Sequence, residues 1–152
     1  MKFQVKDFMS RDVKFVRPDS NAKEALKLLL SEGTSGMPVI DKDGRPVGVF
    51  TEKEILKAVL PGYVQDVGAF IYAEDSKSTL KKIAGLEKIL VKDIMRVEIS
   101  TIQEETSVSE ASRIMLTRSE RRIIVLKDGK AVGVITRCDV VKALANAAGV
   151  EL

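Results

Sequence analysis

The stretch that decides the fold is VGVFTEKEILKAV at residues 47–59, which returns as VGVITRCDVVKAL at residues 132–144. Each copy passes from alternating apolar residues around a glycine to a threonine, then to an acid three positions later, within a run of helical spacing. That order is typical of a strand that ends where a helix begins. The chain therefore contains an internal repeat, and the extent of the repeat decides how the rest is interpreted.

The repeat covers most of the chain. VKDFM at residues 5–9 returns as VKDIM at residues 91–95, and Val39 matches Val125 at the same offset. After the turn DKDG, which is KDG in the second copy, the offset is one residue shorter, so that Thr51 matches Thr136. A turn tolerates a one-residue length change more readily than a helix or strand does.

Each copy predicts the order strand, helix, strand, strand, helix, which is a mixed α/β class. The leading strand is VKFV or VEISTI, the first helix follows an N-cap at Ser20 or Thr106, and two β-rich runs are joined by a glycine turn. A unit of about 60 residues buries too little surface to be stable alone. We therefore expect the two copies to share a core.

Three segments are predicted: a first repeat at residues 1–60, a connection at 61–90 and a second repeat at 91–152. Within the connection, Ser78–Leu90 has the spacing of an amphipathic helix, and Tyr63, Phe70 and Tyr72 precede it. We expect its apolar face to pack on the core, the alternatives being a lid, a strut or a dimer contact. The apolar positions of this helix are Leu80, Ile83, Ala84, Leu86 and Ile89.

Composition excludes most catalytic classes. The chain has no histidine and one cysteine among 152 residues, which rules out Ser-His-Asp and Cys-His catalysis, histidine metal sites and a thiolate zinc site within the chain. Only carboxylates remain for acid–base work, so an enzyme is the function least expected. The single cysteine and the absence of a signal sequence or a long apolar run predict a reducing, cytoplasmic location without a membrane span.

Charge does not indicate nucleic-acid binding by itself. The 25 basic and 22 acidic residues give a net charge of +3. The lysine-rich run KSTLKKIAGLEKILVK at residues 77–92 could attract a polyanion, but we expect a solvated helix face there.

The doubled threonine and acid have two compatible interpretations. Thr51 with Glu54 matches a capping box, in which both side chains satisfy free amides at a helix start, and Thr136 with Asp139 is a shorter version. The same geometry suits a nucleoside phosphate, because the free amides favour an anion and the acid can accept hydrogen bonds from ribose hydroxyls.

The ordered succession of VKDxM, PDSNAKEAL, MPVIDKDGRPVGVFT and KAVGVITRCD resembles a tandem pair of cystathionine-β-synthase (CBS) domains, or Bateman module, over residues 5–59 and 91–144. The resemblance implies two β-α-β-β-α repeats packed sheet to sheet with pseudo-two-fold symmetry. It also implies that AMP, ADP, ATP or S-adenosylmethionine binds in the cleft between the repeats, as a regulatory ligand and not as a catalytic cofactor. Such modules form homodimers and regulate an enzyme, channel or transporter, here a separate protein.

The resemblance also assigns the site residues. Thr136 and Asp139 match the family's Thr-x-x-Asp, which implies contact with phosphate or ribose, whereas Glu54 replaces the aspartate beside Thr51. We therefore predict asymmetric sites, with the Asp139 site more competent and Glu54 better suited to capping. Further contacts are implied for Lys14, Thr34, Ser35, Gly36, Met37 and Pro38 in the first copy, and for Ser100, Glu120, Arg121, Arg122, Ile123 and Ile124 in the second.

Three arginines flank the strand that the resemblance places beside the adenine, a fourth lies inside the second Thr-x-x-Asp motif, and a planar guanidinium suits phosphate oxygens. We expect one or two of them to reach the phosphates of a bound nucleotide, and Cys138 to fill a small apolar space. The alternative function is a ligand-independent scaffold, which Glu54 and the replacement of proline by Ile124 favour. The four arginines are Arg118, Arg121, Arg122 and Arg137.

Overall fold

The computed structural model describes residues 3–60 and 76–151. The chain divides into two compact units: unit 1 consists of Met1–Val13, Asp43–Pro46 and Ile99–Leu152, and unit 2 of Lys14–Lys42 and Val47–Glu98. Both units combine helices with a small sheet, which confirms the predicted mixed α/β class.

Unit 2 is built around a two-stranded sheet. The helix α1 (Ala22–Ser31) precedes β1 (Gly36–Ile40) and β2 (Pro46–Thr51), and α2 (Glu52–Val59) begins where β2 ends. The connection contributes α4 (Ser76–Ala84) and the 3-10 helix η3 (Gly85–Lys88), followed by the short α5 (Val91–Ile94). The buried residues of this unit are Val16, Ala22, Ala25, Leu29, Met37, Val39, Phe50, Ile55, Val59, Leu86 and Val91.

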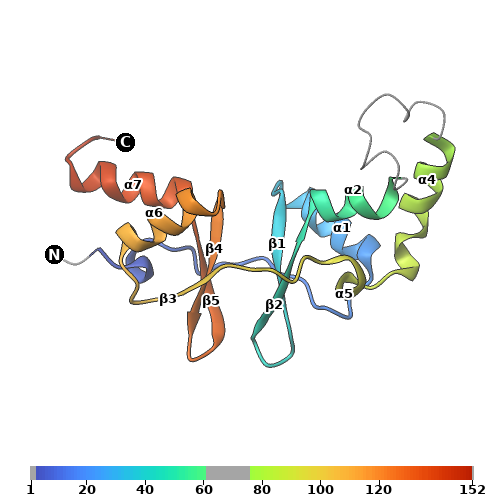
Figure 1. Ribbon diagram of the computed structural model, residues 1–152, viewed down its shortest axis with the longest axis horizontal. Coiled ribbons are helices and arrows are strands. Elements are labelled where there is room, and N and C mark those ends of the chain that lie inside the picture. The colour runs from blue at the N-terminus through green and yellow to red at the C-terminus, as the bar shows by residue number, and fades with distance from the viewer. Residues whose placement is uncertain (1–2, 61–75, 152) are drawn as a thin grey trace. The chain divides into compact units, whose positions relative to one another are not determined.

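Unit 1 has a three-stranded sheet in the order β3-β4-β5. The strand β3 (Thr101–Gln103) pairs parallel with β4 (Arg122–Lys127), and β4 pairs antiparallel with β5 (Lys130–Thr136). The helices α6 (Val108–Thr117) and α7 (Arg137–Ala147) contact each other and the β4–β5 hairpin, and both lie on the same side of it (Figure 1). The buried residues are Val5, Ile102, Val108, Ala111, Met115, Ile123, Val125, Ile135 and Val140.

The two copies differ in their leading strands. In the second copy the strand forms as β3, whereas in the first it is reduced to a single parallel bridge between Val16 and Val39. The Ile124 amide donates to the Ser100 carbonyl over 3.3 Å, but the equivalent residue in the first copy is Pro38, which has no amide hydrogen. The ladder therefore cannot extend toward Lys14.

The leading segments pack on the opposite repeat. The 3-10 helix η1 (Val5–Asp7), in the blue N-terminal part of Figure 1, joins unit 1 through a bond of 2.8 Å from the Val5 amide to the Thr106 carbonyl. The Val91 amide likewise donates to the Ser20 carbonyl over 2.8 Å in unit 2. The sequence repeats and the compact units therefore divide the chain differently.

The glycine of each VGV motif allows the leading segment of one repeat to pack on the other repeat. A Cβ on Gly133 would lie 2.8 Å from the Ser10 carbonyl oxygen, and a Cβ on Gly48 would lie 2.8 Å from that of Arg96. Both distances are far below van der Waals contact. The glycine of VGV is thus needed for close approach of another backbone.

The buried residues form two clusters, and each contains residues of both copies, so the copies share core residues as predicted but in two clusters. Each cluster includes a residue from the leading segment of the other repeat: Val5 belongs to the unit 1 cluster and Val91 to the unit 2 cluster. The leading segment of the other repeat thus supplies apolar surface that a single copy would lack.

The predicted N-caps are each one residue early. The side chain of Asn21 accepts from the Glu24 amide over 2.8 Å, and that of Ser107 accepts from the Glu110 amide over 3.1 Å. Asparagine and serine are both strong capping residues.

The helix predicted for Ser78–Leu90 is present in part, since α4 gives way to η3 after Ala84. Leu86 is buried, and Ile83 and Ile89 pack against the same core, which agrees with the core-packing interpretation. Leu80, however, is 67% exposed. Tyr63, Phe70 and Tyr72 lie outside the described residues.

Candidate functional site

In unit 1, the threonine and the acid of the repeat meet at the point where β5 ends and α7 begins. The Thr136 hydroxyl accepts from the Asp139 amide over 3.1 Å, and the Asp139 carboxylate accepts from the Thr136 amide over 2.8 Å. This is a closed capping box, and it holds a hydroxyl and a carboxylate at a helix N-terminus.

Strand register brings the other predicted residues of unit 1 to the same end of the sheet. Arg122 lies opposite Thr136, and the Arg137 amide donates to the Arg121 carbonyl over 2.9 Å. Ile123 belongs to the core, and its neighbour Ile124 is also buried but lies outside that cluster. Because side chains alternate along a strand, Arg122 and Ile124 share the face turned away from the core cluster.

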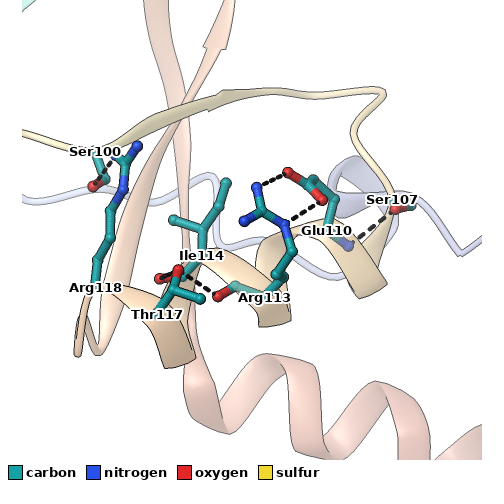
Figure 2. A network of polar contacts seen from close by, with 7 residues as sticks. All are labelled: Ser100, Ser107, Glu110, Arg113, Ile114, Thr117 and Arg118. Carbon is teal, nitrogen blue, oxygen red and sulfur yellow. Dashed lines mark hydrogen bonds and ion pairs between the residues drawn. The ribbon is translucent and has the colours of Figure 1, made fainter.

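A polar network crosses this end of the sheet. The buried Ser100 hydroxyl donates to the Glu120 carboxylate over 2.8 Å. The Arg118 guanidinium donates to the Ser100 hydroxyl over 3.1 Å, as Figure 2 shows. The Arg137 guanidinium donates to the backbone carbonyls of Glu120 and Met115, over 3.0 and 3.4 Å. Arg118 thus ties the end of α6 to the segment before β3, and Arg137 ties the start of α7 to α6 and to the turn that follows it.

Arg121 and Arg122 are adjacent in sequence where β4 begins. Arg121 is exposed and Arg122 is half-buried. Burial lowers the pKa of Arg122, and the neighbouring positive charge of Arg121 lowers it further. Both causes penalise the charged form of the Arg122 guanidinium.

The equivalent place in unit 2 is built differently, although Thr51 again caps its helix by accepting from the Glu54 amide, over 3.3 Å. The Thr51 hydroxyl lies 3.3 Å from Oε1 of Glu54, and α2 has no closed capping box. The prediction that Glu54 suits the capping box better than Asp139 is therefore wrong. The longer Glu54 side chain turns its carboxylate to the Thr51 hydroxyl, whereas Asp139 reaches the backbone amide.

Of the remaining predicted residues of unit 2, Ser35 lies beside the start of α2. The Glu52 amide donates to the Ser35 carbonyl over 3.0 Å, and the Thr34 hydroxyl donates to the Gly36 carbonyl over 3.0 Å. The β1 strand that follows is buried throughout, from Gly36 through Met37 and Pro38, whereas Lys14 is exposed.

Sequence reasoning missed the carboxylate contact of Glu120, which had been considered only as part of a turn. Its partner Ser100 lies 20 residues away, and no local pattern links the two. Cys138 is exposed on the first turn of α7, so the expectation that it fills an apolar space is wrong. Over residues 3–60 and 76–151 there is no group of acidic or cysteine side chains that could hold a metal ion, and no helix is long and apolar enough to cross a membrane.

A family model described as "CBS domain" matches residues 5–61 and 91–146. The chain is similar to "CBS domain-containing protein CBSX1, chloroplastic" of Arabidopsis thaliana, with 32% identity over 93% of this chain and 64% of that protein. It is also similar to an uncharacterized protein of Methanocaldococcus jannaschii, with 24% identity over 92% of this chain and 90% of that protein. The chain thus spans less than two thirds of the CBSX1 relative.

Solved structures agree with these matches. The crystal structure of the CBS-pair protein CBSX2 from Arabidopsis thaliana gives a TM-score of 0.79 at 26% identity, over 98% of this chain and 99% of that one. A crystal structure of CBSX2 in complex with AMP gives a TM-score of 0.73 at 28% identity, over 96% of this chain and 98% of that one.

Proposed function

Because the chain belongs to the CBS-domain family as a tandem pair, we propose that it is a regulatory module that binds an adenine nucleotide (AMP, ADP or ATP) or S-adenosylmethionine. The observation that carries the proposal is the complex of CBSX2 with AMP, since that protein shares the fold over nearly the whole of both chains. We propose that the stronger of the two sites is the one formed by residues of unit 1.

The chemistry of that constellation supports a nucleoside phosphate. The N-terminus of α7 presents amides with partial positive charge, which favour a phosphate oxygen. The Asp139 carboxylate is held beside Thr136 and suits the vicinal hydroxyls of a ribose. We propose that Thr136 and Asp139 carry the affinity and that Thr51 and Glu54 form the weaker site, because Glu54 is 7% exposed and turned to its own helix start.

Calorimetric titration of the purified chain, freed of carried-over ligand, tests the proposal with AMP, ADP, ATP and S-adenosylmethionine. Asp139→Ala should weaken binding about tenfold or more, because hydrogen bonds to a charged group contribute about 1.5–3 kcal/mol each. Asp139→Ala removes the partner of the N-cap Thr136 at the start of α7, and the control is Ser107→Ala, which removes a capping side chain at the start of α6 but lies outside the constellation. An equal loss in both variants would show that Asp139 acts through helix stability alone.

A ligand-independent scaffold is the second candidate, and one observation favours it. Among the described residues, every buried side-chain nitrogen and oxygen has a hydrogen-bond partner within the protein. The Ser100 hydroxyl and the Asp139 carboxylate, which the resemblance assigns to a ligand, are thus already satisfied. A folded, ligand-free chain that binds none of the four compounds would contradict the adenosyl-ligand proposal and favour the scaffold.

The finer features of the proposal follow from the family and the composition. We propose a non-catalytic role, a homodimer, and a regulated enzyme or transporter as the separate partner. A reducing compartment such as the cytoplasm fits the single cysteine. We also propose that the functional domains are the two sequence repeats, residues 1–60 and 91–152, joined by the connection at residues 61–90.

A further inference from the structure

Both units expose large apolar side chains at equivalent positions of their helices. In unit 1 these are Leu116 of α6 and Val141 of α7, and in unit 2 their equivalents are Leu30 of α1 and Leu56 of α2, each more than half exposed. A single exposed apolar residue needs no explanation, but here the same two positions are exposed in both copies. We call Leu116 and Val141 with their exposed neighbours the unit 1 face, and Leu30 and Leu56 with theirs the unit 2 face.

The unit 1 face combines an apolar stripe with a cation. On α7 the exposed residues Arg137, Val141 and Leu144 are spaced so that they lie on one side of the helix. The Arg137 guanidinium donates to the Met115 carbonyl over 3.4 Å, so the start of this stripe lies against the last turn of α6, where Leu116 is exposed. The positive charge therefore lies at one end of the exposed apolar residues.

The unit 2 face has an acid where the unit 1 face has that cation. Glu52 is equivalent to Arg137, is exposed, and lies one helical turn before Leu56 on α2. Glu32, the C-cap of α1, is likewise equivalent to Arg118, the C-cap of α6. Within the described part of the chain, neither Glu32 nor Glu52 forms an ion pair. Because the Arg118 guanidinium is turned to Ser100 (Figure 2), the charge contrast beside the apolar residues rests mainly on Arg137 and Glu52.

The two faces also differ in how much apolar surface they expose. The helix α4 contacts α2, and Val59 is buried in the same cluster against which Ile83 of α4 packs. The residue of α7 equivalent to Val59 is Leu144, which is exposed. A helix of the chain thus covers the far end of the unit 2 stripe, so a contact between two unit 2 faces would bury less apolar surface.

We propose that the unit 1 face of one copy docks on the unit 2 face of a second copy, in preference to either face docking on its own equivalent. This inference rests on the homodimer within the proposed function and specifies the surfaces that form it. Pairing of like faces brings Arg137 toward another Arg137, or Glu52 toward another Glu52. Pairing of unlike faces brings a guanidinium toward a carboxylate beside the apolar contact, and such complementarity selects one arrangement against the others.

Sedimentation velocity on the full chain, at a low salt concentration of about 50 mM where surface charges are least screened, tests the pairing. Glu52→Arg should raise the dissociation constant of the dimer about tenfold or more, because two cations then meet across the contact. Glu52→Arg/Arg137→Glu should recover most of the lost affinity, because it exchanges the two charges. If like faces pair, Glu52→Arg replaces one like-charge contact by another and the dissociation constant stays nearly unchanged.

The matched control is Glu87→Arg, which also reverses an exposed acid of unit 2. Glu87 lies on η3 and pairs with Lys23, at the opposite end of α1 from Leu30, so the variant should keep the wild-type dissociation constant.

A cross-linking experiment gives a second test that leaves Arg137 and its hydrogen bonds intact. Cys138, the single cysteine, is exposed next to Arg137, and Lys53 is exposed next to Glu52. A flexible cysteine-to-amine reagent attached to Cys138 should therefore react with Lys53 of a second copy. Mass spectrometry on mixed nitrogen-15-labelled and unlabelled chains identifies the products that join two copies. Products between copies that join Cys138 to Lys142, and not to Lys53, would overturn the pairing.

The pairing and the proposed function fail in different ways. A chain that is monomeric at every concentration would overturn both the homodimer and the pairing, and the calorimetric test of nucleotide binding would be unaffected. A dimer that Glu52→Arg does not weaken, or that Glu87→Arg weakens equally, would overturn the pairing alone. A folded double variant that does not recover affinity would also overturn it, and the cross-linking result decides if that variant unfolds.

Discussion

Replacement of Gly133 by alanine should destabilise the chain, although the change adds a single methyl group. The new Cβ would lie 2.7 Å from Met9 Sδ and 2.8 Å from the Ser10 carbonyl oxygen. Met9 can change rotamer, but the Ser10 carbonyl is held, because Ser10 and Val134 exchange two backbone hydrogen bonds of 2.9 and 3.0 Å. The leading segment must therefore shift, and these bonds must lengthen.

The magnitude follows from those contacts. Overpacking costs about 1–3 kcal/mol, and each weakened backbone bond contributes about 0.5–1.5 kcal/mol. We expect the free energy of unfolding to fall by about 2–4 kcal/mol, a large part of the roughly 5–15 kcal/mol typical of a domain. Gly48→Ala should cost a similar amount, because its Cβ would meet Met95 Sδ at 2.6 Å and the Arg96 carbonyl at 2.8 Å.

Urea unfolding followed by circular dichroism measures the effect. The matched control is Gly85→Ala, whose Cβ would meet nothing within 4 Å, so stability should be unchanged or rise by about 0.4–1 kcal/mol. In a Met9→Ala background the cost of Gly133→Ala should persist, since the Ser10 carbonyl remains. A loss below about 0.5 kcal/mol for Gly133→Ala would refute the close-approach argument.

Three further predictions concern stability and titration. Ser107→Ala should lower the free energy of unfolding by about 1 kcal/mol in urea, because the N-cap of α6 is lost. The hydrogen bond from Arg113 lowers the pKa of Glu110 (Figure 2), so this pair stabilises the fold above the unfolded pKa of the carboxyl and the contribution is lost as pH falls through the lower folded value. NMR titration should show Glu110 protonating at higher pH in Arg113→Gln, and an unchanged midpoint would contradict the pairing. Phe50→Ala should cost about 3–5 kcal/mol because Phe50 is fully buried, whereas Leu30→Ala, at a position 64% exposed, should cost below about 0.5 kcal/mol.

The order of elements could be predicted because the signals are local. The glycine turns, the run of alternating residues before Thr51 and Thr136, and the helical spacing after them all lie within one copy of the repeat. The errors at Ser20 and Thr106 arose where two adjacent residues could both cap a helix, and the first turn of the helix selected the second of each pair.

Long-range pairing is what local patterns could not reveal. VKDFM and VKDIM are nearly identical, so neither indicates which repeat it joins. The contact of Ser100 with Glu120 depends on the parallel pairing of β3 with β4. The capping box predicted at Thr51 and Glu54 does not close, because the additional methylene of Glu54 turns its carboxylate to the Thr51 hydroxyl and not to the backbone amide.

The packing of each leading segment on the other repeat also affects how the chain folds during synthesis. Ser10 leaves the ribosome long before Val134, and the two are bonded to each other in the folded protein. A contact between residues so distant in sequence forms only after the intervening chain has been made, and closing so long a loop has an entropic cost. Val5 is fully buried in the folded protein, in a cluster made mostly of second-copy residues. Its side chain therefore lacks these contacts until the second copy has been translated. The hydrogen bonds between Ser10 and Val134 can therefore form only after most of the chain has been synthesised.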